Sequence, residues 1–221
     1  MNVISYESWR DFIFTHAGDN YSDNDLYFSE IVPMKCSVWV EYSIRLFQKP
    51  EEMLPYGLES VADGLWYVLT EFDYLSEPFR QAENEIALKL ANSMWNLFLN
   101  FFQRLCLERQ IKLPASGEHK LESPCFFWWE DLCYRGAPLN PMAKDIDRLV
   151  LKIMSDCCYL GNICCKKSGV YGLGGWHRNY PNEVEGAIDQ FLLDHQLLIA
   201  KHPNLAALAR NARDGLQIPL G

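Results

Sequence analysis

PNEVEGAIDQFLLDHQLLI, at positions 181–199, places apolar side chains in every helical turn. Residues three and four apart share one face of a helix, and such an apolar stripe is typical of an amphipathic helix packed on a core. Asn182, directly after Pro181, is expected to cap this helix at its N-terminus. The residues on the predicted buried face are Val184, Ile188, Phe191, Leu192, His195, Leu198 and Ile199.

The same spacing of apolar residues recurs along most of the chain. It predicts helices over 5–16, 34–48, 58–72, 126–134, 142–159 and 204–213, with loops that include 18–25 and 111–124. An unbroken pattern from Phe79 toward Pro114 predicts one helix of about 30 residues, well above the globular mean. No segment shows the two-residue alternation of a half-buried strand. The predicted fold is all-α, either an irregular α-α superhelix of the HEAT kind or a globular helical bundle.

Composition favours one domain over residues 1–221, because 49% of the 221 residues are hydrophobic and supply an ample core. The formal net charge is −9, from 20 basic and 29 acidic side chains. That field repels phosphate backbones, so nucleic acid is not an expected partner. The acidity either keeps the protein apart from its neighbours or attracts a basic protein.

Neither a membrane span nor a secretory leader is expected. The most apolar stretch, residues 94–107, contains Asn96, Asn100, Gln103 and Arg104 and falls short of the roughly 20 apolar residues that a membrane helix needs. The first seven residues lack a basic region followed by an apolar run. We therefore predict a cytoplasmic protein with no membrane partner.

Four of the eight cysteines lie within nine residues, as the pairs Cys157–Cys158 and Cys164–Cys165. A turn at Gly161 would bring the two pairs together, and thiolates so arranged bind zinc. A redox disulfide and simple core packing are the alternatives, because free cysteine behaves as a small hydrophobe. Most of the eight thiols are expected to be reduced and buried, and no cofactor is predicted.

Aromatic residues supply the candidate binding residues. The segment CFFWWEDLCY, residues 125–134, carries more aromatic surface than one helix face buries, so Trp128 and Trp129 are either core between two halves of the chain or anchors for a partner. A second group comprises Tyr171, Trp176, His177 and Tyr180. His177 is either a proton carrier or ligand, or a structural residue, since no orienting carboxylate is recognisable nearby.

Gly172, Gly174 and Gly175 precede the predicted helix at 181–199. Their backbone amides are suited to an anion-binding turn, but no strand precedes them and the spacing matches neither common phosphate motif. A connection that packs closely under Trp176 is the favoured interpretation.

The segment YGLGGWHRNYP, residues 171–181, together with Glu183 to Glu185 and the Phe191–Leu192 end of the helix, resembles the C-terminal stretch of a group of uncharacterised bacterial helical proteins with HEAT-like character. In that group the pattern commonly reads HGLGHW before an aromatic-proline turn and a final helix. Tyr171 and Gly175 stand where that pattern has histidines. The resemblance implies an α-superhelical architecture and carries no established activity.

The chain lacks the common catalytic motifs, including the zinc-protease HExxH motif, the nucleophile elbow and the kinase signature. The main hypothesis is an interaction protein without catalytic activity, whose partner is another protein. One alternative is a metal- or small-molecule-binding enzyme that uses the region from Cys157 to His177. Another is an acidic immunity-type protein that neutralises a basic toxin.

Overall fold

Helices form the architecture of this protein. The structure is a computed structural model that describes residues 4–16, 34–70, 74–106 and 121–216. Within those ranges the chain forms α-helices, short 3₁₀ segments and one π-helical turn, and no strand. The prediction of an all-α fold is confirmed.

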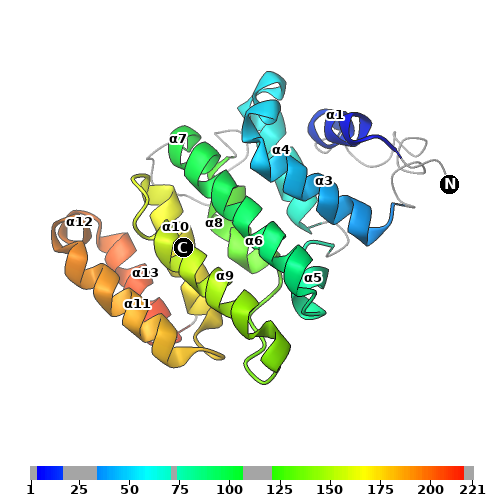
Figure 1. The fold of residues 1–221 in the computed structure, drawn as a ribbon. Helices are drawn as coiled ribbons and strands as arrows, with labels where there is room; N and C mark the ends of the chain where they lie inside the picture. The colour runs from blue at the N-terminus through cyan, green and yellow to red at the C-terminus, as the bar shows by residue number, and fades with distance from the viewer. Residues whose placement is uncertain (1–3, 17–33, 71–73, 107–120, 217–221) are drawn as a thin grey trace.

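The longer helices lie in two layers, each with its members side by side (Figure 1). One layer contains α3 (Cys36–Gln48), α6 (Asn84–Leu97), α9 (Lys144–Cys157) and α11 (Pro181–Asp194). The other contains α1 (Tyr6–His16), α4 (Leu58–Thr70), α8 (Glu122–Asp131), α10 (Ile163–Trp176) and α13 (Pro203–Arg213). The α10 helix packs on α8, α13 and α9, so it links the two layers at the centre of the fold.

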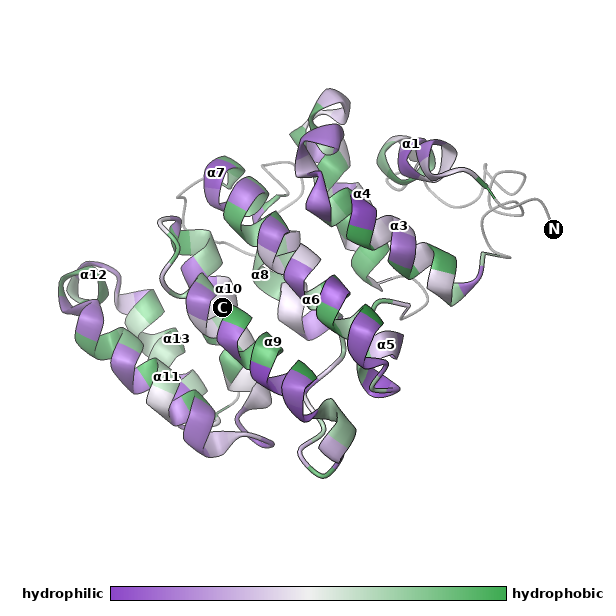
Figure 2. Ribbon diagram, in the orientation of Figure 1, coloured by the Kyte–Doolittle hydropathy of each residue, from purple (hydrophilic) through white to green (hydrophobic). Residues whose placement is uncertain are grey.

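Shorter elements connect these helices. They are η1 (Pro50–Tyr56), α5 (Glu77–Arg80), η3 (Phe98–Phe102), α7 (Gln103–Leu105), η4 (Pro141–Ala143) and α12 (Gln196–Lys201). Figure 2 shows hydrophobic and hydrophilic residues interspersed along most helices, as amphipathic elements require. Among the described residues, no helix combines the length and apolarity needed to cross a bilayer.

Aromatic residues fill the core between the layers. Trp128 of α8 is fully buried, and its ring lies 5.4 Å from Phe47, 6.1 Å from Phe98 and 5.7 Å from Phe102, measured between centroids. Most of these contacts are edge-on, the arrangement that the ring quadrupole favours. The ring of Trp129 instead stacks on Phe98, at 5.4 Å. These contacts join α8 to α3 and η3.

Glycines bring α10 close to its neighbours. A Cβ at Gly169 would lie 2.4 Å from the carbonyl oxygen of Met154, and one at Gly172 would lie 2.7 Å from the ring of Trp129. Gly172, Gly174 and Gly175 therefore belong to a packed helix, and the prediction of a connection at these positions is wrong. The close packing expected of these glycines is found at Gly172, which lies against the ring of Trp129.

The segment at 181–199 is two helices. The α11 helix ends at Asp194, His195 has φ −116° and ψ 31°, and α12 follows from Gln196. Pro181 is the first helical residue, with Tyr180 as the N-cap residue, so the prediction of an Asn182 cap is wrong. Proline suits the first helical position because the amide it lacks has no partner there. The predicted buried face is confirmed for Val184, Ile188 and Phe191.

The long helix predicted from Phe79 is also wrong. The chain turns at Ala82, which adopts φ 53°, and α6 begins only at Asn84. The amide of Glu83 donates to the carbonyl of Pro78 at 3.0 Å, a bond that ends α5 in the manner of a Schellman motif. Alanine occupies a position where glycine is usual, so this break could not be predicted from the residue type.

The predicted loops fall largely outside the described residues. The loop at 18–25 and positions 111–120 of the loop at 111–124 lie there, whereas residues 122–124 begin α8. The other predicted helices are confirmed to within a few residues at most of their ends. Ser5 caps the start of α1, since its hydroxyl accepts from the amide of Ser8 at 3.1 Å.

Candidate functional site

The three tryptophans predicted to bind a partner are buried. Trp128, Trp129 and Trp176 expose 0%, 2% and 1% of their surface. They contribute to the core instead, as the alternative interpretation held for Trp128 and Trp129. Trp176 stacks on Tyr180 at 5.7 Å, so these two predicted residues lie together, with Trp176 buried and Tyr180 half-buried.

A different set of aromatic side chains reaches the surface. Trp66 of α4, Phe127 of α8 and Tyr171 of α10 form a continuous row, which we call the aromatic row. The ring of Phe127 lies 5.9 Å from Trp66 and 6.0 Å from Tyr171. Trp66 is 36% exposed, and the other two are half-buried. Sequence reasoning singled out Tyr171 but missed its two partners, because the row forms only when three helices pack together.

Acidic groups flank the aromatic row. Glu130 and Asp131 lie three and four residues after Phe127, on the same side of α8. The carboxylate of Glu130 accepts a hydrogen bond from the hydroxyl of Tyr171. Oδ2 of Asp131 is buried and has no hydrogen-bond partner among the described residues. Burial, and next the charge of Glu130, raise the pKa of Asp131 to about 6.

The α4 end of the row is acidic as well. Residues 50–70 contain four acidic and no basic side chains: Glu51, Glu52, Glu59 and Asp63. Glu59 and Asp63 precede Trp66 by seven and three residues, which places them on its side of the helix. Leu54 in η1 and Leu58 at the start of α4 are exposed apolar residues of the same segment, at 49% and 40%.

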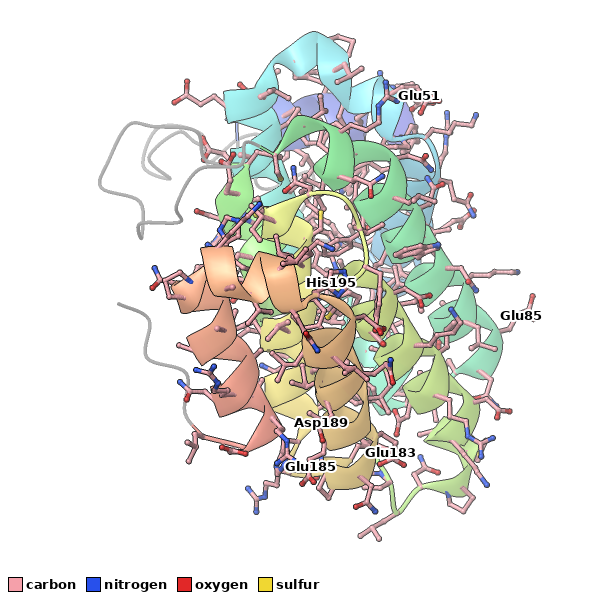
Figure 3. The ribbon with its side chains drawn as sticks, turned by 90° about the vertical axis from the view of Figure 1, so that its left-hand side faces the viewer. Glu51, Glu85, Glu183, Glu185, Asp189 and His195 are labelled. Carbon is pink, nitrogen blue, oxygen red and sulfur yellow. The ribbon has the colours of Figure 1, made fainter. Side chains whose placement is uncertain are left out.

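His177 has an acidic partner that the sequence did not reveal. Its Nε2 lies 3.3 Å from Oε1 of Glu185 in α11. Glu185 and its neighbours Glu183 and Asp189 are labelled in Figure 3 along α11. Gly215 packs against the imidazole so closely that a Cβ there would lie 2.4 Å from Nδ1. This crowding indicates a structural role for His177.

Tyr180 also belongs to a structural network. Its hydroxyl donates to the buried carboxylate of Asp147, which accepts a second bond from the hydroxyl of Tyr134. Burial, and next the bond to Asp147, raise the pKa of both phenols, so both are protonated donors at neutral pH. These two hydrogen bonds to Asp147 connect the segment after α8 and the start of α11 to α9.

The cysteines form a cluster that differs from the predicted one. The sulfur atoms of Cys106, Cys125 and Cys164 all lie within 4.8 Å of one another, and all three residues are buried. Cys165 is buried next to Cys164 in α10, and it is among the groups that raise the pKa of the Cys125 thiol. We call these four residues the thiol cluster. Of the predicted zinc ligands, it contains Cys164 and Cys165 only.

The other two predicted ligands lie elsewhere. Cys157 and Cys158 are buried at the end of α9, and the thiol of Cys158 donates to the carbonyl of Met154 at 3.4 Å. Cys106 and Cys125 are distant in sequence from the pair at 164–165, so no spacing motif reveals the cluster. The eight cysteines carry no disulfide, and six of them are buried, as expected for most.

Asn162 holds two parts of the thiol cluster in position. Its side-chain oxygen caps α10 by accepting from the amide of Cys164 at 2.8 Å, and its Nδ2 donates to the carbonyl of Cys106 at 2.7 Å. Thiol hydrogen bonds from Cys106 and Cys125 hold the pKa of Cys164 well below its usual range. Burial raises the pKa of the Cys125 thiol.

Two lysines follow the cluster in α10. Lys166 is 6% exposed, and Nζ donates to the carbonyl of Cys158 at 3.0 Å and lies 3.4 Å from Nε2 of His195. Burial lowers its pKa, while the neighbouring thiols of Cys158 and Cys165 raise it. Lys167 is partly buried, and its charge acts on Cys164.

Comparison of the chain with protein-family models, with curated proteins and with solved structures finds no match. The candidate sites are therefore interpreted from their own chemistry.

Proposed function

We propose that this chain is an interaction protein that binds a basic segment of another protein on the aromatic row. The observation that carries the proposal is the contact of Trp66, Phe127 and Tyr171 across three helices, with Trp66 36% exposed. Large, rigid aromatic side chains supply most of the free energy of binding at many interfaces. A half-exposed tryptophan offers such an anchor without prior rearrangement of the core.

Charge selects the class of partner. Glu59, Asp63, Glu130 and Asp131 surround the row, and the whole chain carries a net charge of −9. Lysine and arginine side chains pair with carboxylates and also bind the faces of aromatic rings. A basic partner therefore satisfies both the aromatic and the acidic parts of this surface.

The arrangement of helices is compatible with this role. Helices side by side in two layers are the pattern from which HEAT-like superhelical binding proteins are built, and we extend the proposal to that class of architecture. Neutralisation of a basic toxin is a narrower form of the same proposal, because it requires the same acidic surface. Long-range attraction of this kind weakens as salt concentration rises.

Selection from a displayed peptide library against the immobilised full chain tests the proposal. We expect selected peptides to be enriched in lysine and arginine, and their affinity to fall steeply with salt. Trp66→Ala and Phe127→Ala are expected to weaken binding about tenfold or more, as loss of an anchor does. Leu139→Ala is the matched control, because Leu139 is 97% exposed and lies between α8 and η4, outside the row.

The two variants distinguish this surface from others. Equal affinity of the Trp66→Ala variant and the wild type would place binding elsewhere and refute the proposal. Peptides without basic enrichment, or an affinity that salt does not change, would refute the assignment of a basic partner.

A further inference from the structure

We propose that the thiol cluster binds one zinc ion, with Cys106, Cys125 and Cys164 as ligands and Cys165 as the fourth. The site would tie the end of α7 to α8 and to the start of α10. It is independent of the aromatic row and of the function proposed for it.

The geometry of the sulfur atoms carries the proposal. Zinc binds thiolates at about 2.3 Å in a tetrahedron, which separates neighbouring sulfurs by roughly 3.8 Å. The three sulfurs of Cys106, Cys125 and Cys164 all lie within 4.8 Å of one another, so closure around an ion needs only small side-chain movements. Cys165 is buried next to Cys164 in the first turn of α10, and it is the further thiol that we assign as the fourth ligand.

The choice of ion follows from the ligands. Thiolates are soft ligands that select zinc, copper(I) or iron–sulfur clusters over magnesium and calcium. Four thiolates from three helical segments, all buried, form the closed type of site that holds a structural zinc ion. A closed site leaves no position for substrate, so the ion would stabilise the fold.

The surrounding charges suit a zinc–thiolate centre. One zinc ion with four thiolates carries a net charge of −2, which is costly to bury without compensation. Lys166 and Lys167 provide two positive charges beside Cys165 and Cys164. The N-terminus of α10, where Cys164 occupies the first turn, adds the positive end of a helix dipole.

The buried position of Lys166 supports this compensation. Lysine is almost never fully buried unless it is paired with a negative charge. The hydrogen-bond partners of Lys166 among the described residues are a backbone carbonyl and an imidazole, both without negative charge. A thiolate centre one residue before it supplies the missing charge.

The test is elemental analysis of the full chain purified without chelator, followed by titration of the metal-free protein with cobalt(II). We expect about one zinc per chain, and cobalt binding with the sulfur-to-metal charge-transfer absorption of a thiolate site. The Cys125→Ser variant is expected to retain a tenth of the zinc or less. Cys157→Ser is the matched control, since Cys157 is equally buried but lies outside the cluster, and it should keep a full equivalent.

Several outcomes would overturn the proposal. Wild-type protein that contains no zinc and shows no cobalt–thiolate absorption would refute it. Equal loss of zinc in the Cys125→Ser and Cys157→Ser variants would also refute it. Stoichiometric iron or copper in place of zinc, or a disulfide between Cys106 and another thiol found by mass spectrometry, would assign the cluster a different role. The cobalt titration uses the wild-type chain, so the test stands even where the Cys125→Ser variant fails to fold.

Discussion

The hydroxyl of Tyr134 donates a 2.6 Å hydrogen bond to the carboxylate of Asp147, and both residues are buried. The same carboxylate accepts from the amide of Ala137 at 2.8 Å and from the hydroxyl of Tyr180. A buried carboxylate is tolerated only when several donors replace the water it has lost. This one therefore depends on groups from the α8–α9 connection and from the start of α11.

Removal of one donor should destabilise the fold. We expect Tyr134→Phe to lower the free energy of unfolding by about 1.5–3 kcal/mol, because it leaves a buried charge with one hydrogen bond fewer. Urea denaturation followed by circular dichroism measures the change. Tyr159→Phe is the control, since its phenol bonds Asp194 on the exposed surface, and its effect should stay within about 0.5 kcal/mol. Equal losses in the two variants would contradict this account of Asp147.

Two tryptophans should differ sharply in their effect on stability. Trp128→Ala is expected to cost about 3–5 kcal/mol, because it empties a fully buried site between Phe47, Phe98 and Phe102. Trp66→Ala should cost markedly less, since its side chain is already 36% exposed. Thermal and urea unfolding of both variants measure the difference. A Trp66→Ala variant as unstable as Trp128→Ala would make Trp66 a core residue rather than a surface anchor.

Replacement of two helical glycines by alanine should change the stability of the protein in opposite directions. Gly169→Ala places a Cβ 2.4 Å from the carbonyl oxygen of Met154, and this collision should destabilise the protein by about 1–3 kcal/mol. Gly186→Ala, in α11, meets no atom within 4 Å and should stabilise by about 0.5–1 kcal/mol. The melting temperatures of the two variants check the sign. A stabilising Gly169→Ala would show that α10 and α9 are less tightly packed than the structure indicates.

Asp131 should make stability depend on pH. Its pKa is raised to about 6 in the folded state, so the folded state favours the protonated acid. The stability that this preference contributes is present below the unfolded pKa of about 4 and is lost as pH rises through about 6.

Asp131→Asn removes that pH dependence. We expect the variant and the wild type to be equally stable near about pH 4, and the variant to be more stable by about 1 kcal/mol near about pH 8, after allowance for the partial exposure of the carboxyl group. Urea unfolding across this range measures the difference. A difference in the free energy of unfolding that grows toward low pH would contradict this account of Asp131.

Periodicity predicted most helices because burial of one face leaves a direct record in the sequence. Val184, Ile188 and Phe191 illustrate this, since each is fully buried at the expected position. Helix ends that lack glycine or proline could not be predicted in this way. Ala82 and His195 interrupt helices where the local sequence is compatible with continuation, and only tertiary packing decides the outcome.

The candidate sites were harder to predict for a related reason. Trp128 and Phe127 are neighbours in one aromatic run, yet one is buried and the other reaches the surface, because exposure depends on which face of α8 meets α3 and η3. Likewise, Cys164 carried a recognisable local signal, whereas Cys106 and Cys125 join it only through the packing of separate segments.

The π-helical turn at Phe98–Phe102 determines the direction in which the chain leaves α6. In a regular α-helix each residue advances by about 100° around the axis. A π-helical turn holds one residue more, so it rotates the side chains of the following residues around the axis. Cys106 comes directly after α7, only a few positions beyond that turn. Insertions or deletions between Phe98 and Leu105 should therefore misalign the sulfur of Cys106, even though they leave every ligand in the sequence.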